Sequence, residues 1–293
     1  MDSPTRASAT SKGAPAPAVR PRRRRLTLSA RVGSLLLAVV ALAAVFPIAF
    51  TRANPEQVDI MSRLAPPTRA HPLGTDNIGR DLLARLVYGS RVSLLVALVS
   101  VGGAVVLGVT LGLLAGYYGR WTEAGIMRLV DVFLAFPAIL LALALVATLG
   151  AGVSSVIIAL ILVFWTQYAR VVHGATLAVK ERSFVEAARA IGAGDGRILL
   201  RHVLPNIISP IVILATLGMG TAVVAESTLS FLGIGVQPPT PSWGWTLAFG
   251  TRYLRDAPHL ATFSGLAIMA TVLGFNLLGD GIRDLLDPRF RAQ

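Results

Sequence analysis

Charged residues are missing from five long stretches of this 293-residue chain. A helix that crosses a membrane needs about 20 residues without charges, because about 30 Å of hydrocarbon is covered at roughly 1.5 Å per residue. The uncharged stretches hold 20, 28, 38, 24 and 23 residues and cover 32–51, 92–119, 132–169, 202–225 and 257–279. Gly150, Ala151 and Gly152 divide the third stretch into two spans. The sequence therefore predicts an all-α polytopic membrane protein with six transmembrane helices.

The composition agrees with this class and excludes several kinds of site. Apolar residues make up 54% of the chain, only 14% are charged, and there is no cysteine. A disulfide framework and a thiolate zinc site are therefore excluded. Lys12 and Lys180 are the only lysines and neither follows a glycine, so the phosphate-binding pattern G-x-x-x-x-G-K-[ST] is absent.

Arginines predict the orientation of the six helices. Six of them lie between residues 20 and 31, and the segment 170–206 is also basic. Because positive loops stay in the cytoplasm, both termini are predicted to be cytoplasmic, and the loops 52–90 and 233–258 to face outward. The first span is longer than the apolar core of a signal peptide, which favours an uncleaved anchor. The basic tail before it, residues 1–30, lacks apolar periodicity and is predicted to be disordered, with a role in orientation and contact with anionic lipid.

One face of the second predicted span consists of small residues. Gly108, Gly112 and Gly116 recur every fourth residue, one turn after Ala104. A second helix can approach closely on such a face. We interpret it as packing within the bundle, with a subunit seam or a surface of the translocation path as alternatives.

The segment 180–206 predicts a helix-turn-helix in the cytoplasm. Phe184, Ala187, Ala188 and Ile191 recur at helical spacing, and the run Gly192-Ala193-Gly194 ends the helix as a C-cap turn does. Asp195 is predicted to cap a second helix, which continues to Pro205 at the membrane boundary. The small side chains of Ala187 and Ala188 predict an exposed face against which another protein packs. The alternative is an amphipathic hairpin lying on lipid.

Several features are predicted for the outer surface. Residues 81–87 predict a helix lying at the outer interface. His71 is interpreted as part of a turn rather than as a metal ligand. Trp243 and Trp245 predict either anchoring at the membrane interface or contact with a binding protein. Arg91 and Glu226 border apolar runs, and we expect them to pair, to snorkel or to line the substrate path, with an outer structural role favoured.

The residues of the predicted hairpin resemble a known motif. Glu186-Ala187-Ala188, then Gly192, then Leu204-Pro205 resemble the EAA loop of the membrane subunits of binding-protein-dependent ABC importers. His202 stands where that pattern expects an aliphatic residue. The stretches 71–97, 226–245 and 276–289 resemble the same proteins, in order. The chain is therefore similar to a dipeptide/oligopeptide permease subunit of the C type.

This resemblance implies a MetI-like permease core in a bacterial inner membrane. It implies a second, similar permease subunit, two ATPase subunits and an extracytoplasmic peptide-binding protein as partners, with no cofactor and no nucleic acid. Glu186, Ala187, Ala188, Gly192, Leu204 and Pro205 would form the surface that couples the permease to an ATPase groove. The implied organisation is a tail at 1–30, a first helix and outer loop at 31–89, a five-helix core at 90–283 with the coupling loop at 180–206, and a C-terminal tail at 284–293.

Other cargoes and other functions remain as alternatives. The same machinery could import nickel complexes or glutathione. An ion-coupled secondary transporter would normally place ionisable groups near the membrane midplane, where this sequence has almost none. A membrane-embedded hydrolase would need a positioned nucleophile. Ser264 lies in a span, but the four histidines fall in loops or at span ends and no G-x-S-x-G turn occurs.

Overall fold

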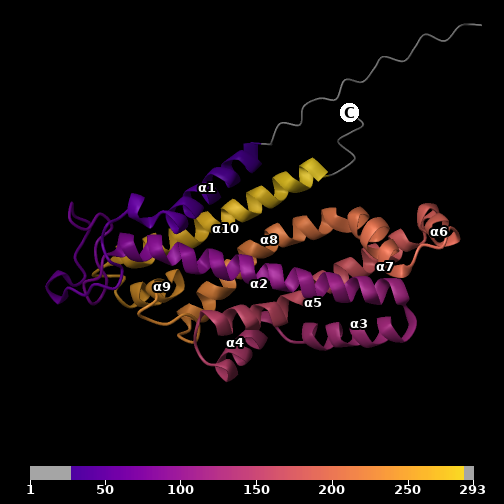
Figure 1. The fold of residues 1–293 in the computed structure, drawn as a ribbon. Helices are drawn as coiled ribbons and strands as arrows, with labels where there is room; N and C mark the ends of the chain where they lie inside the picture. The colour runs from indigo at the N-terminus through magenta and orange to yellow at the C-terminus, as the bar shows by residue number, and fades with distance from the viewer. Residues whose placement is uncertain (1–27, 287–293) are drawn as a thin grey trace, which may run out of the picture.

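The computed structural model describes residues 28–286, and helices make up most of this part of the chain (Figure 1). The predicted tails, 1–30 and 284–293, lie almost entirely outside the described residues. The helices are α1 (Leu28–Val45), α2 (Leu82–Tyr118), α3 (Arg120–Leu134), α4 (Ala138–Leu149), α5 (Val153–Lys180), α6 (Ser183–Ala190), α7 (Asp195–Ile198), α8 (Leu204–Phe231), α9 (Trp243–Arg252) and α10 (Pro258–Leu286).

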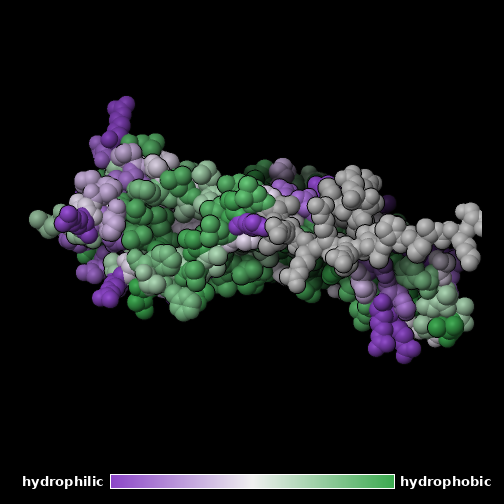
Figure 2. Space-filling view, turned by 90° about the horizontal axis from the view of Figure 1, so that it is seen from above, coloured by the Kyte–Doolittle hydropathy of each residue, from purple (hydrophilic) through white to green (hydrophobic). Residues whose placement is uncertain are grey.

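Five single helical segments are long and apolar enough to cross a membrane. They are α1, α2, α5, the continuous run Asp195–Phe231 that contains α8, and α10. The sixth crossing exists only if α3 and α4 together form one span, because they meet at an angle of 89°. On the face seen in Figure 2, hydrophobic residues cover the middle of the molecule and hydrophilic residues gather toward its two ends. The all-helical fold of a polytopic membrane protein is confirmed.

The third predicted span differs from the simple helix that the sequence suggested. Pro137 is the N-cap of α4, and the helix is interrupted between Leu134, the last residue of α3, and Ala138, the first residue of α4. A proline disfavours the helical conformation of the residue before it, here Phe136, and so explains the break. The 12 residues of α4 reach only about 18 Å, which is less than the hydrocarbon thickness of about 30 Å. The predicted fold-back holds: α4 ends at Gly150 and α5 begins after Gly152.

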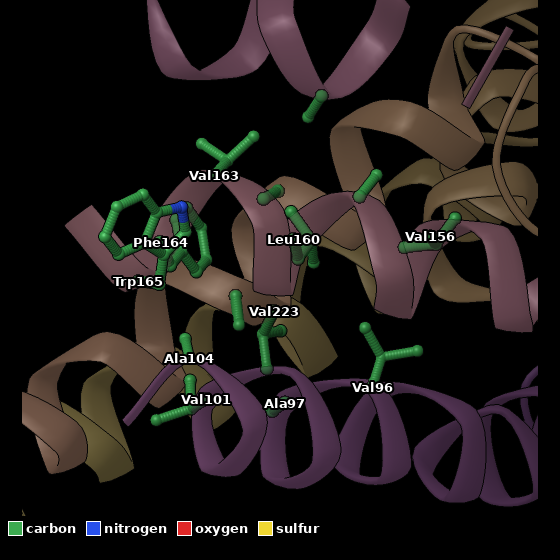
Figure 3. Packing of buried hydrophobic residues seen from close by; sticks show 14 of the residues in the cluster. Val96, Ala97, Val101, Ala104, Val156, Leu160, Val163, Phe164, Trp165 and Val223 are labelled. Atoms are coloured by element: carbon green, nitrogen blue, oxygen red, sulfur yellow. The ribbon is translucent and has the colours of Figure 1, made fainter. Parts of the chain in front are cut away.

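The centre of the bundle is formed by α2, α5 and α8. Figure 3 shows Val101 of α2 and Leu160 of α5 projecting into the same buried cluster as Val223 of α8. Phe133 of α3 joins this cluster through an edge-to-face contact with Trp165, with ring centroids 5.8 Å apart. The core therefore holds three long helices together and attaches α3 to their side.

Glycines bring α2 unusually close to α5. A Cβ atom added at Gly108 would lie 2.4 Å from the carbonyl oxygen of Trp165, and one added at Gly112 would lie 2.6 Å from that of Ala169. A Cβ at Gly116 would lie 2.7 Å from Cβ of Thr176. Any side chain at these three positions would force the two helices apart. The small-residue face thus packs against a helix of the same chain.

The two ends of the bundle differ in structure. One end carries the irregular segment 46–81, which we call the loop end, and the other carries α6 and α7, which we call the hairpin end (Figure 1). The first residues of α1 and the last residues of α10 both point toward the hairpin end. The 37 residues of α2 reach about 55 Å, well beyond the hydrocarbon thickness of about 30 Å. The long helices therefore extend past the membrane.

Two predictions about the loop end are wrong. Asp81 caps α2 by accepting from the backbone N–H of Ala84 at 2.8 Å, and the helix then runs without interruption to Tyr118. Residues 82–87 are thus the first turns of a span rather than a separate interfacial helix. Trp243 is buried and donates from Nε1 to the carbonyl oxygen of Leu86 at 2.8 Å. It packs α9 against α2, so Trp243 neither anchors the chain at the lipid interface nor offers a surface to a partner. Trp245 is half-buried, and its role stays a prediction.

Ion pairs and turns order the segment before α2. Asp76 accepts from Arg80 Nε at 2.6 Å and lies 3.7 Å from Nε of the buried Arg85. The turn predicted at His71 is present, since the N–H of Gly74 donates to the carbonyl oxygen of His71 at 2.9 Å. At Asp59 the hydroxyl of Ser62 donates to the carboxylate at 2.7 Å, and this bond lowers the pKa of Asp59. The loop end is therefore a fixed structure held by local polar contacts.

Candidate coupling site

The predicted helix-turn-helix is present at the hairpin end as α6 and α7. Helix α6 ends in a Schellman motif: the N–H of Gly192 donates to the carbonyl of Arg189 at 2.9 Å, and that of Ala193 donates to the carbonyl of Ala188 at 3.0 Å. Gly192 has a φ of +81°, a backbone conformation that residues other than glycine rarely adopt. Glycine is therefore the residue best suited to the direction in which the chain leaves α6.

The start of α7 differs from the prediction. Gly194, not Asp195, is its N-cap residue, and Asp195 occupies the first helical position without a capping hydrogen bond. The carboxylate of Asp195 instead accepts from the hydroxyl of Tyr117 at 2.7 Å. Sequence reasoning assigned this carboxylate to local capping because it could not place the end of α2 beside it.

A π-helical turn over Leu199–Val203 joins α7 to α8. The N–H of Leu204 donates to the carbonyl of Leu199, five residues earlier. Pro205 then follows in the first turn of α8, where a missing N–H is tolerated. Leu204 is half-buried and Pro205 is exposed. The predicted pair therefore stands at the beginning of the long helix α8 rather than on the tip of the hairpin.

One face of the hairpin packs against the bundle. A buried apolar cluster joins α6, α7 and the π-helical turn to the ends of α2 and α5; its members include Leu113, Tyr117, Val172, Val179, Val185, Ala188, Ile198, Leu199 and Val203. Ala188 is only 5% exposed, because it occupies the inner face of α6 together with Val185. The prediction that Ala187 and Ala188 share an exposed face is therefore wrong: they are neighbours in the sequence, 100° apart around the helix.

The other face of the hairpin is free within the chain. Glu186, Ala187 and Gly192 are exposed, and Ile191 is 85% exposed. A Cβ atom added at Gly192 would have no neighbour within 4 Å. This surface combines a large apolar side chain with small neighbours and one carboxylate. It is suited to enter a groove of another protein.

Three contacts of α2 that sequence reasoning missed hold the hairpin in place. Besides the hydrogen bond to Asp195, the ring of Tyr117 lies under the guanidinium of Arg189, 5.2 Å from the ring centroid. Lys180, the last residue of α5, donates from Nζ to the carbonyl of Gly116 at 2.8 Å. The sequence did hold one signal for the contacts of Tyr117: a tyrosine at the end of a predicted span can pack against the arginine of a neighbouring basic helix. The two contacts of Tyr117 link the hairpin directly to the last turn of α2, and the contact of Lys180 fixes the end of α5 from which the hairpin leaves.

A pairing of Arg91 with Glu226, one of the alternatives that the sequence left open, is not found. Arg91 donates to the carbonyl oxygens of Ala44 and Val45, which are free at the end of α1. The two helices α1 and α2 thus meet at a guanidinium that also complements the negative end of the α1 dipole. Arg91 has an outer structural role of a different kind from an ion pair.

Glu226 is fully buried near the loop end of α8 and accepts hydrogen bonds from four serines. Ser230 and Ser242 donate to Oε1 at 2.9 and 3.1 Å, and Ser93 and Ser227 donate to Oε2 at 3.3 Å. Because Ser242 is also the N-cap of α9 and Ser93 belongs to α2, this carboxylate ties three helices together. The hydrogen-bond partners of the Glu226 side chain are therefore serine hydroxyls rather than the arginine that the sequence suggested as one alternative.

No part of this arrangement resembles a catalytic centre or a metal site. Within residues 28–286, no three His, Cys, Asp or Glu side chains are grouped so as to hold a metal ion. His71 does have a carboxylate neighbour that sequence spacing did not suggest, since its Nδ1 lies 2.9 Å from Oδ2 of Asp81. Ser264 is buried, and its hydroxyl has no hydrogen-bond partner.

Comparison with known proteins gives a consistent result. The sequence profile of the family described as "binding-protein-dependent transport system inner membrane component" matches residues 108–292. The chain is 43% identical to the dipeptide transport system permease protein DppC of Alkalihalophilus pseudofirmus, over 89% of this chain and 86% of that protein. It is 42% identical to the glutathione transport system permease protein GsiD of Pectobacterium atrosepticum, over 92% and 89% of the two chains.

A solved structure shares the fold. A chain of the MetNI methionine ABC transporter in an inward-facing conformation superimposes with a TM-score of 0.56 and is 21% identical, over 69% of this chain and 96% of that one. At this identity the likeness concerns the fold alone. The two chains share the arrangement of their helices over the superimposed part.

Proposed function

The chain belongs to the family of binding-protein-dependent transport system inner membrane components, and on this premise we propose that it is a permease subunit of an ATP-driven importer of dipeptides or oligopeptides. The observation that carries the proposal is the 43% identity to a dipeptide permease over 89% of the chain. The exposed face of the α6–α7 hairpin supports it, because in an ATP-driven importer a permease without its own nucleotide site needs a surface on which the ATPase subunits act.

The proposed partners follow from this role. A second permease subunit of the same family would complete the translocation path, and two ATPase subunits would bind at the hairpin end. An extracytoplasmic binding protein would deliver the solute to the loop end. The chain itself would perform no chemistry, and ATP would be hydrolysed by the ATPase subunits.

We assign the coupling surface to Glu186, Ala187, Ile191 and Gly192. Ala188 lies beneath this surface, in the buried cluster that attaches α6 to the bundle. Leu204 and Pro205 begin α8, so a displacement of the hairpin would be transmitted through them to that helix. A short helix held by a Schellman turn and by Tyr117 moves as a rigid body. Rigid displacement is what a two-state transporter requires.

The proposed location is a bacterial inner membrane, with the hairpin end and both termini in the cytoplasm. The proposed organisation keeps a basic tail at 1–30, a first helix and outer loop at 31–89, a core at 90–283 and a short tail at 284–293. The basic residues of α6, α7 and the following turn support this orientation, because they gather at the hairpin end.

The test is reconstitution of the chain with its partner subunits and binding protein in proteoliposomes. Uptake of a labelled dipeptide should require ATP and should persist when an uncoupler removes the proton gradient. Uptake that follows the gradient at constant ATP would assign the chain to ion-coupled transport instead.

Glutathione is the second candidate cargo, because a glutathione permease is 42% identical to this chain. Competition of unlabelled glutathione, nickel complexes and dipeptides in the same assay separates the three. Since a binding protein selects the cargo, each competitor is to be tested with the binding protein that co-purifies with the complex.

A further inference from the structure

Charged side chains gather, among the apolar residues Ala124 and Met127, on one face of the pair α3 and α5, which lie side by side (Figure 1). A hollow of about 500 Å³ on this face is lined by residues that include Arg120, Glu123, Arg128, Asp131 and His173. Two contacts bridge the two helices there: the ion pair of Arg170 with Asp131, and a hydrogen bond between Nε2 of His173 and Oε1 of Glu123 at 2.9 Å. The coupling role described above uses none of these residues.

This face continues along α5 into the part of the helix that lies in the membrane. Gln167, Arg170 and Gly174 are exposed at spacings of three and four residues, so they form one stripe. Arg170 follows the first residue of α5, Val153, by 17 residues, which is about 26 Å of helix and less than the hydrocarbon thickness of about 30 Å. Measured from Val153, Gln167 and Arg170 therefore lie within the hydrocarbon thickness, toward its inner boundary, and Gly174, about 32 Å along the helix, lies at that boundary.

The ion pair at this depth is not shielded by the chain. The side chains of Arg170 and Asp131 are 55% and 66% exposed. Charged side chains in transmembrane segments almost always face a bundle interior or a water-filled cavity, because hydrocarbon cannot solvate them. The exposed face of α2 is different: Leu98, Val99 and Val106 cover it with apolar side chains that suit lipid. The α3–α5 face is thus the one that needs water beside it in the assembled complex.

The charges on this face have both signs, and this limits what they recognise. A guanidinium binds a carboxylate with two parallel hydrogen bonds, and a carboxylate accepts from an ammonium group. A polyanionic solute or a lipid phosphate would be attracted by the arginines but repelled by the carboxylates of Glu123 and Asp131. A molecule that carries one ammonium and one carboxylate can pair its carboxylate with an arginine of this face and its ammonium with Glu123 or Asp131. The volume of the hollow falls within the usual range for small-molecule sites, about 300–1,000 Å³.

We propose that the α3–α5 face lines the inner half of the solute path and that its Arg170–Asp131 pair binds the ionic groups of a zwitterionic peptide. This inference rests on the proposed function and names a binding surface for it. Each member of the pair has a charged partner in the empty path and exchanges it for a terminus of the solute, so neither is left unpaired. The α3–α5 face therefore receives a peptide without a large desolvation penalty.

The absence of cysteine from the chain allows a direct test. Gln167→Cys on the stripe and Val106→Cys on the apolar face of α2 are introduced singly into the complete complex in inside-out vesicles. A membrane-impermeant methanethiosulfonate reagent is applied from the former cytoplasmic side without nucleotide. Because only a thiolate in water reacts, we expect Gln167→Cys to be labelled at least about tenfold faster than Val106→Cys. Equal rates would overturn the proposal.

The second arm tests recognition with matched probes. Dialanine, which carries both terminal charges, should slow the labelling of Gln167→Cys, whereas cyclic dialanine, which carries neither, should leave the rate unchanged. Adding Arg170→Gln should abolish the protection, and Arg170→Lys should restore part of it. Equal protection by both probes, or by neither, would overturn the assignment. The labelling does not depend on uptake, so a complex that fails to import peptides refutes the proposed function without affecting this result.

Discussion

Tyr117 and Asp195 are 78 residues apart in the sequence, yet the hydroxyl of Tyr117 donates to Oδ1 of Asp195 at 2.7 Å. This hydrogen bond joins the last turn of α2 to the first residue of α7. Since α2 packs along α5 through its glycine face, a displacement of the hairpin reaches both helices through one side chain. The contact is therefore one direct link between the hairpin and the last turn of α2.

The first prediction concerns this hydrogen bond. Tyr117→Phe keeps the ring beneath Arg189 and removes only the hydroxyl, at a cost of about 0.5–1.5 kcal/mol in stability. We expect the complex to assemble and to hydrolyse ATP, but to import several times fewer peptides per ATP. The measurement is the ratio of uptake to hydrolysis in proteoliposomes.

The control for Tyr117 is its neighbour Tyr118, which is half exposed at the same end of α2. Tyr118→Phe should leave the ratio of uptake to hydrolysis unchanged. If Tyr117→Phe also leaves it unchanged, the hydrogen bond only positions α7 and does not transmit movement.

The second prediction concerns the turn at the end of α6. Gly192→Val places a β-branched residue at a φ of +81°, at a cost of about 1–3 kcal/mol, so the Schellman turn should open and uptake should be lost. Gly192→Asn should retain much of the uptake, because asparagine tolerates this conformation better. Insertion and assembly should be normal in both variants.

Gly194 provides a matched control two residues later. Its φ is −71° and a Cβ atom there has no neighbour within 4 Å, so Gly194→Ala should transport normally. Normal uptake by Gly192→Val would show that the turn has no role in coupling. Uptake and complex assembly are to be measured on the same membranes.

The third prediction separates the two alanines of α6. In the cysteine-free chain, Ala187→Cys should crosslink to a cysteine placed in the groove of an ATPase subunit, because Ala187 is exposed. Ala188→Cys should crosslink much more slowly, because that side chain is buried among the residues of α7 and α2. Crosslinking yields on denaturing gels provide the comparison. Equal yields at the two positions would mean that α6 binds by a different face.

The sequence was informative where one local rule determined the outcome. The uncharged stretches located the spans, the glycine spacing located the close face of α2, and Gly192 located the end of α6. In each case hydrophobicity, helical period or backbone conformation acts within a few residues. Pro137 was also a local signal for the break between α3 and α4, and it was overlooked.

Partners that are distant in the sequence could not be predicted. Arg91 and Glu226 have opposite charges at similar depth, but carbonyl oxygens at the end of α1 bind the first and four serines surround the second. Trp243 has the composition of an interface anchor and is buried under α2 because α9 folds back into the bundle. These outcomes depend on how helices are placed relative to one another. A single sequence does not contain that information in readable form.

The fourth prediction concerns the buried carboxylate. Glu226→Ala leaves four serine hydroxyls without their acceptor and should lower the stability of the complex by about 2–4 kcal/mol. Glu226→Gln should have a smaller effect, because its amide keeps one acceptor oxygen. Thr228→Ala, at a half-buried position on the same helix whose hydroxyl donates to the carbonyl of Val224 and not to Glu226, is the control. The readout is thermal unfolding in detergent, and equal stability of Glu226→Ala and the control would rule out a structural role.

The fifth prediction concerns the glycine face of α2. A Cβ atom at Gly112 would lie 2.6 Å from the carbonyl oxygen of Ala169 and 2.8 Å from Cβ of Val172, so Gly112→Ala must push α2 away from α5. Overpacking of this kind costs about 1–3 kcal/mol. Gly102→Ala is the matched control, because a Cβ there meets no atom of the chain within 4 Å. That variant should be neutral or slightly stabilised, since alanine favours a helix more than glycine does.

The same pair of variants decides between packing within the chain and a seam between subunits. If the glycine face serves the chain itself, Gly112→Ala should lower the unfolding temperature of the isolated subunit in detergent. If the face were instead a subunit seam, the isolated subunit would keep its unfolding temperature and lose only its affinity for the second permease subunit. The contact between Gly112 and the backbone of Ala169 predicts the first result, because a side chain at this position meets α5 whether or not a partner is bound.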